Sequence, residues 1–206
     1  MGGLQSEIAV FTAAADWAGG LVAKIPTGAW SGPGLGDWNL RALVGHTSRA
    51  LLTVEQYLAK PAAQVDVDSA AAYYEQTGAG PATDAAAVLQ RGVDAGAALG
   101  DDPAGEFAAI ARRVTTLLRS APDGIVTTIV GGMRLHDYLP TRTFELAVHG
   151  LDIAAATGRP PSAPAEVSRR ALDLAVELGT RAGSGGEILL ALTGRGGLPR
   201  GFSVLP

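Results

Sequence analysis

The 206-residue sequence predicts a mainly α-helical protein, an antiparallel four-helix bundle with a small C-terminal α+β appendage. Apolar residues recur at helical spacing in four long segments, and stretches rich in Gly and Pro separate these segments. The composition, 47% hydrophobic and 17% charged, is that of a globular chain. We expect the bundle over residues 1–160 and the appendage, a helix plus a β-hairpin, over residues 161–206.

The first helix is expected from Leu4, where apolar or small residues begin to alternate in steps of four and three, to Ile25, before Pro26. Asn39 is a good N-cap for the second helix, which should run to about Lys60. The buried face of this second helix should carry Leu40, Leu43, Val44, Thr47, Leu51, Val54 and Leu58.

A polar linker follows, and the third leg of the bundle is expected as two helical pieces, 83–100 and 104–121, broken between Gly100 and Pro103. Residues 121–135 contain a β-branched run and glycines, which indicates a short extended connection. The fourth helix should cover about 137–157 and end before Gly158.

The last part of the chain changes in character. A helix is expected at about 164–182, followed by a "GSGG" hinge. The segments "EILLALTG" and "FSVL" then indicate two short strands around a Gly/Pro turn.

The fourth helix contains the segment "TRTFELAVHGLD", residues 141–152, whose polar residues face an unusual direction. At about 100° per residue, a polar stripe lies between two apolar rows, so it points toward the core. A buried, unpaired carboxylate costs several kcal/mol, so these charges need partners. An internal ion pair of Arg142 with Glu145 or Asp152 would provide them, as would a metal bound by Glu145 and His149 at i and i+4.

His46 offers a third ligand from the second helix. It lies at the edge of the apolar face, and Ala42 and Ala50, one turn to either side, leave space beside the ring. The alternative for His46 is a histidine packed at the rim and hydrogen-bonded to a backbone carbonyl, which is the more common environment of a single histidine.

Two segments resemble a known family. "DWNLRALVGH" is similar to the start of the second helix, and "GGMRLHDYLPTRTFELAVHGLDIAAATGRP" to the fourth helix, of the mycothiol-dependent maleylpyruvate isomerase and DinB-like superfamily. The second segment carries the pattern R-x-x-E-x-x-x-H-x-x-D of that family. The resemblance covers about residues 4–160 and implies a DinB-like bundle.

The resemblance implies a divalent metal bound by His46, Glu145 and His149 with coordination positions left open. Zinc is the expected metal, and iron or nickel would also suit two histidines and one carboxylate. It further implies a low-molecular-weight thiol cofactor such as mycothiol. That cofactor is compatible with a chain that has no cysteine of its own, and the Ala/Gly/Arg-rich composition is compatible with an actinobacterial source.

Three further residues are candidates for roles around this site. Arg142 and Asp152 flank the proposed ligands, where they would orient them, bind substrate or pair with each other. Arg91, on the third leg, would bind a substrate carboxylate if it faces the cavity, and is otherwise a solvated surface residue. The residue that performs the chemical step is not identified by the sequence.

The expected function is therefore a metal- and thiol-dependent isomerase or S-transferase acting on an electrophilic small molecule. Maleylpyruvate itself is a doubtful substrate, because the chain has no Arg or Lys between Lys60 and Arg91, where that isomerase has an essential arginine, and because the appendage is short. The alternatives are a non-catalytic DinB-like module that binds a ligand or protein, and a metal-dependent hydrolase that activates water.

Charge and hydropathy exclude other classes of partner. The net charge is −4 and the arginines are scattered, which argues against nucleic acid or an anionic membrane surface. No uncharged stretch approaches the ~18 residues that span a bilayer, and no signal peptide begins the sequence. We expect a cytoplasmic protein whose partners are its small substrate and thiol; the sequence has no signature of an oligomeric state.

Overall fold

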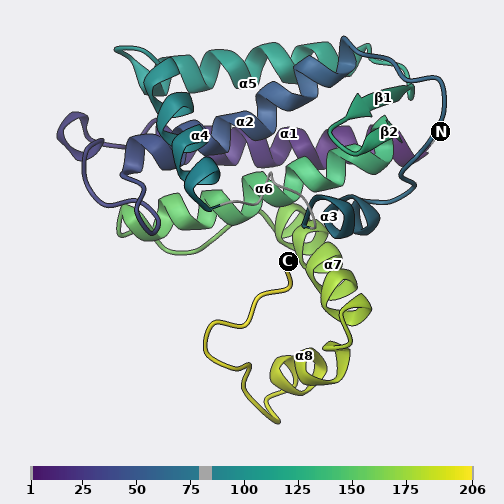
Figure 1. The fold of residues 1–206 in the computed structure, drawn as a ribbon. Helices are drawn as coiled ribbons and strands as arrows, with labels where there is room; N and C mark the ends of the chain where they lie inside the picture. The colour runs from purple at the N-terminus through teal and green to yellow at the C-terminus, as the bar shows by residue number, and fades with distance from the viewer. Residues whose placement is uncertain (1, 79–84, 206) are drawn as a thin grey trace.

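The computed structural model describes residues 2–78 and 85–205, and it confirms a mainly α-helical fold (Figure 1). Helices α1, α2, α5 and α6 lie alongside one another as a bundle, and α7 and α8 project from it. The helices are α1 Gly2–Val22, α2 Leu40–Leu58, α3 Ala70–Gly78, α4 Ala85–Ala98, α5 Pro103–Arg119, α6 Leu135–Ala156, α7 Ala165–Arg181 and α8 Gly185–Leu192, with a 3-10 turn at Thr27–Ala29.

Helix α6 is the central element of the bundle, because it contacts α1, α2 and α7. Its apolar residues Leu146 and Ile153 are fully buried. On another side, Gly150 lies so close to Trp17 of α1 that a methyl group at position 150 would overlap with the indole ring. Little of α6 is therefore left to face water, and its polar residues must find partners inside the protein.

The predicted caps and breaks of the helices are present. The Asn39 side chain accepts a hydrogen bond of 2.8 Å from the Ala42 backbone N–H, which fixes the start of α2. Gly100 has a φ of +67° between α4 and α5, and this left-handed conformation accounts for the break in the third leg. The start of that leg, expected at residue 83, lies outside the described residues.

Helices α2 and α4 approach closely at two glycines. A methyl group at Gly45 would overlap with the backbone of Gly96, and the Arg41 Nε–H donates to the Gly96 carbonyl at 2.8 Å. One turn before Arg41, the Trp38 indole N–H donates to the Leu89 carbonyl at 2.9 Å. These contacts fix α4 against the N-terminal half of α2.

The extended connection expected at 121–135 is a hairpin of two antiparallel strands, β1 Ile125–Thr128 and β2 Gly131–Arg134. Its register pairs Ile125 with Arg134 and Thr128 with Gly131. The turn between the strands places Ile129 at the surface, with 61% of the residue exposed.

The polar linker predicted after α2 is partly wrong, because residues 70–78 form helix α3. Both tyrosines of its sequence "AAAYYEQTG", Tyr73 and Tyr74, are buried. The helix packs against α6 and α7, and an ion pair of 3.6 Å joins Glu75 to Arg181 of α7. A helix this short has almost no stability alone, so its formation depends on tertiary packing that the local pattern does not reveal.

The β-hairpin predicted in the appendage is wrong. The segment "EILLALTG" contributes to helix α8, and "FSVL" forms no strand in the described residues. A short apolar run fits either a strand or a buried helix, and here the leucines and alanine favour the helix. Ile188 of α8 packs over Gly179 of α7, where a side chain would overlap with it. The division of the chain at residue 160 stays a prediction.

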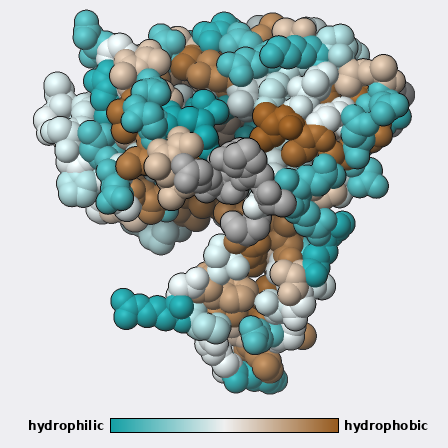
Figure 2. Space-filling model, viewed as in Figure 1, coloured by the Kyte–Doolittle hydropathy of each residue, from teal (hydrophilic) through white to brown (hydrophobic). Residues whose placement is uncertain are grey.

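The projecting part of the chain exposes apolar side chains, and brown surface appears there in Figure 2. The large exposed apolar residues of this part are Leu172, Val176, Leu189, Leu190, Leu192, Leu198 and Leu205. None of the helices within 2–78 and 85–205 combines the length and hydrophobicity needed to cross a membrane.

We predict that Gly45→Ala lowers the free energy of unfolding by about 1–3 kcal/mol, because the added methyl group forces α2 and α4 apart. The matched control is Gly20→Ala in α1, an exposed helical position with no heavy atom within 4 Å of the added carbon. This control should raise stability by up to about 1 kcal/mol. Urea denaturation followed by circular dichroism measures both, and equal effects of the two substitutions would contradict the close contact.

Candidate metal centre

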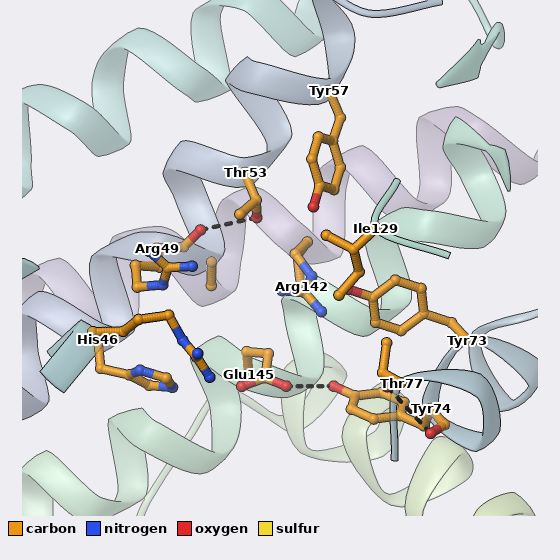
Figure 3. Close-up of a pocket in the computed structure, with 12 residues that line it drawn as sticks. His46, Arg49, Thr53, Tyr57, Tyr73, Tyr74, Thr77, Ile129, Arg142 and Glu145 are labelled. Carbon is orange, nitrogen blue, oxygen red and sulfur yellow. Dashed lines mark hydrogen bonds between the residues drawn. The ribbon is translucent and has the colours of Figure 1, made fainter. Parts of the chain in front are cut away.

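A cavity of about 350 Å³ lies between α2, α3, α4, α6 and the hairpin turn (Figure 3). In the close-up, His46, Glu145 and Tyr74 form a row along one side, and Arg142 lies above Glu145. The lining residues are His46, Arg49, Ala50, Thr53, Tyr57, Tyr73, Tyr74, Thr77, Arg91, Ile129, Arg142 and Glu145.

Three of the residues predicted from the sequence meet at the edge of this cavity. His46 of α2 and Glu145 and His149 of α6 each offer a ligand atom, and these atoms all lie within 4.8 Å of one another. The His149 Nε2 is 3.3 Å from the Glu145 Oε2, and the centroids of the two imidazole rings are 4.8 Å apart. Two nitrogens and one carboxylate oxygen thus converge on one point, the donor set expected for a metal.

The His46 ring is held in place by packing. The Trp38 indole lies over it with a centroid distance of 4.5 Å, and the His46 Nδ1 is buried with no hydrogen-bond partner among the described residues. Burial, assisted by the neighbouring His149, lowers the pKa of His46 to about 4. His46 is therefore neutral at pH 7, the form that binds a metal.

A hydrogen bond from Tyr74 fixes the carboxylate of Glu145. The Tyr74 O–H donates to the Glu145 Oε1 at 2.6 Å, which leaves Oε2 on the side of His149. Burial by itself raises the pKa of this carboxyl, but the hydrogen bond from His149 and the charge of Arg142 outweigh it and lower the pKa to about 2. The glutamate is thus charged at neutral pH, as a metal ligand must be.

Asp152 contacts the opposite side of the His149 ring, with its Oδ2 at 3.0 Å from the Nδ1. Although burial disfavours a charged imidazole, hydrogen bonds to Asp152 and Glu145 raise the pKa of His149 to about 9. When the ring is neutral, an Nδ1 proton donated to Asp152 leaves the lone pair on Nε2, the nitrogen that faces Glu145. Of the three predicted roles of Asp152, orientation of a ligand is the one that the geometry fits.

Arg142 is also buried, with 9% of the residue exposed, but it forms no ion pair within the described part of the chain. Its Nε–H donates to the Thr141 Oγ1 at 2.9 Å, and its guanidinium carbon lies 5.4 and 5.2 Å from the ring centroids of Tyr73 and Tyr138. Of the two alternatives for the polar stripe, the ion pair of Arg142 with Glu145 or Asp152 is not formed among the described residues, because the Arg142 guanidinium lies over aromatic rings and lines the cavity.

Arg91 of α4 lines the cavity, which fits the substrate-facing alternative better than a position on the outer surface. Other lining residues were not predicted from the sequence. Arg49, Thr53 and Tyr57 follow His46 at intervals of three, seven and eleven residues, so helical spacing alone puts them on the His46 face. Tyr73 and Tyr74 had no such signal, because α3 was not predicted.

In metal-free protein, we predict a pKa of about 9 for His149 and about 4 for His46. The stabilising effect of charged His149 is complete below its ordinary pKa of 6.5 and is lost as the pH rises through 9. The contribution of neutral His46 to folding stability is complete above pH 6.5, its ordinary pKa, and is lost as the pH falls through 4. NMR titration of the imidazole protons measures both values, and Asp152→Asn should lower the pKa of His149 but not that of His46. Two histidines that both titrate near 6.5 would contradict this electrostatic arrangement.

Comparison with known proteins identifies a family for the sequence. The sequence matches the family described as mycothiol maleylpyruvate isomerase N-terminal domain over residues 11–154. This range contains α2, α3, α4 and nearly all of α6, and with them His46, Glu145 and His149. No curated protein matches significantly, and no solved structure does. Because the match covers well over half of the chain, the protein belongs to the mycothiol maleylpyruvate isomerase N-terminal domain family.

Proposed function

We propose that this protein is a metal-dependent enzyme that uses mycothiol or a similar low-molecular-weight thiol, and that it acts as an isomerase or S-transferase on an electrophilic small molecule. The observation that carries the proposal is the convergence of the His46, Glu145 and His149 donor atoms within 4.8 Å at the edge of a cavity. Membership in a family described by mycothiol-dependent chemistry supports the thiol.

The donor set fits a divalent metal. The buried Nδ1 of His46 lacks a partner, and a buried polar atom without a partner is costly. Glu145 and His149 each have a further partner, Tyr74 and Asp152, that orients the side chain from behind. Zinc is the metal that we propose, and iron(II) or nickel would suit the same donors.

A metal in this position would lower the pKa of a bound thiol, so that a thiolate is available at neutral pH. The chain itself has no cysteine, so the thiol must come from outside. Tyr74 and Asp152 keep the two α6 ligands in fixed positions, and Trp38 does the same for His46 by stacking. The cavity beside them is large enough for a small substrate.

We propose a substrate other than maleylpyruvate. Between Lys60 and Arg91 the chain supplies two buried tyrosines to the cavity and no arginine or lysine. The cationic groups that line the cavity come instead from α2, α4 and α6. Since the positions of charges determine how a substrate is oriented, this arrangement supports a different specificity.

We predict that the purified protein contains close to one zinc per chain and that His46→Ala loses it, because one of three ligands is gone. Asp152→Asn should weaken zinc binding by about 10- to 100-fold. The matched control is His136→Ala, since His136 pairs with Asp123 and lies outside the cluster of possible ligands. Elemental analysis by mass spectrometry measures the content. A folded protein without metal, or a His46→Ala variant with full content, would favour the non-catalytic binding module.

We predict that mycothiol changes the absorption spectrum of the cobalt(II)-substituted protein by adding a sulfur-to-metal charge-transfer band. The control ligand is S-methylated mycothiol, which has no ionisable thiol and should leave the spectrum unchanged. An unchanged spectrum at saturating mycothiol would reject thiol ligation and favour a hydrolase that activates water.

A further inference from the structure

We propose that the cavity contains an anion subsite, formed by Arg142 and Arg49, that binds the carboxylate of a small organic acid. The inference rests on the proposed function in one respect, since it assigns a charge to the substrate of the same cavity. The subsite itself consists of residues of the chain and needs no metal.

Arg142 provides the first observation. It lines the cavity and is buried, yet only one of the five N–H donors of its guanidinium has a hydrogen-bond acceptor among the described residues, Thr141. The rings of Tyr73 and Tyr138 stabilise the cation through their faces, but these contacts leave the N–H donors at its edge unused. A buried cation without an anionic partner is costly, so the site is built for an anion that arrives with a ligand.

Glu145 does not fill this role. Although burial by itself lowers the pKa of Arg142, the neighbouring Tyr138, Tyr73 and Tyr74 and, to a smaller extent, Glu145 raise it. Among the described residues, Arg142 and Glu145 nevertheless form no ion pair. The Glu145 Oε1 accepts from Tyr74, and its Oε2 faces His149. Both oxygens of the only carboxylate among the described lining residues are therefore engaged elsewhere.

Arg49 provides the second observation. It lies three residues after His46 on the same face of α2 and lines the same cavity. Its guanidinium has no hydrogen bond or ion pair among the described residues. Arg91 adds a third positive charge to the lining, so the cavity carries a cationic excess that attracts anions.

The walls indicate the class of anion. Tyr57, Tyr73 and Ile129 present aromatic and aliphatic surface next to the arginines. The planar fork of a guanidinium matches a carboxylate with two parallel hydrogen bonds. Phosphate sites usually add a glycine-rich loop or a lysine, and the described lining contains neither. We therefore infer a carboxylate on a compact, apolar body.

Benzoate and benzamide test the subsite, because they have the same shape and differ in charge. Calorimetric titration is carried out on the protein as purified and after treatment with a chelator, and metal content is measured on each sample. We expect benzoate to bind and benzamide not to bind at the same concentrations. Arg142→Met should weaken benzoate binding by about 10- to 100-fold and Arg49→Gln by about 10-fold, in both samples.

The control variant is Arg113→Gln, which removes an exposed arginine paired with Glu55 and should bind benzoate like the wild type. Arg49 is only half-buried, so Arg49→Gln keeps the test decisive if Arg142→Met does not fold. Equal binding of benzoate and benzamide, no binding of benzoate to the folded wild type, or wild-type affinity in a folded Arg142→Met or Arg49→Gln variant would overturn the subsite. Metal-free protein that binds benzoate through these arginines would support the subsite even if the proposed function failed.

Discussion

The burial of charged side chains on α6 is the constraint on which the rest of the site depends. A central helix contacted by α1, α2 and α7 leaves Glu145 and Asp152 only partly exposed to water, and a carboxylate with reduced hydration needs hydrogen-bond partners. The protein meets this requirement with a continuous row of hydrogen-bonding groups, from Asp152 through His149 and Glu145 to Tyr74. The two inner groups, His149 and Glu145, each have a partner on either side, which fixes side-chain orientation as well as charge.

The cavity lining contains two kinds of chemical group. His46 joins Glu145 and His149 in a cluster of metal-binding groups. Arg142 and Arg49 add positive charge to the lining, and the guanidinium of Arg142 lies over the rings of Tyr73 and Tyr138. A ligand that reaches both kinds of group would be held at its anionic end while another part lies next to the three ligand atoms, and such fixed orientation is a large part of catalysis.

Much of the bundle was predictable from the sequence, because long amphipathic segments, an Asn cap and glycine breaks act locally. The polar stripe of residues 141–152 also identified the ligand-bearing face, since charged residues between two apolar rows conflict with the usual amphipathic pattern and so indicate a functional site. Two elements were not predictable in this way. Helix α3 and helix α8 are too short for their periodicity to decide their conformation. Contacts with α6 and α7 stabilise α3, and contacts with α7 stabilise α8. One of the two rings that contact Arg142, Tyr73, belongs to α3 and so could not be identified from the sequence.

The position of α3 between α6 and α7 has a mechanical consequence for the chain. Tyr74 binds Glu145 on one side of this short helix, and Glu75 pairs with Arg181 of α7 on the other. The C-terminal part of the protein therefore supports a side chain at the cavity without reaching the cavity itself. A chain ending at residue 160 would keep His46, Glu145 and His149 but would lack one of the two helices against which α3 packs. The hydrogen bond from Tyr74 to Glu145 would then depend on the packing of α3 against α6, so the C-terminal part contributes support to the site from outside it.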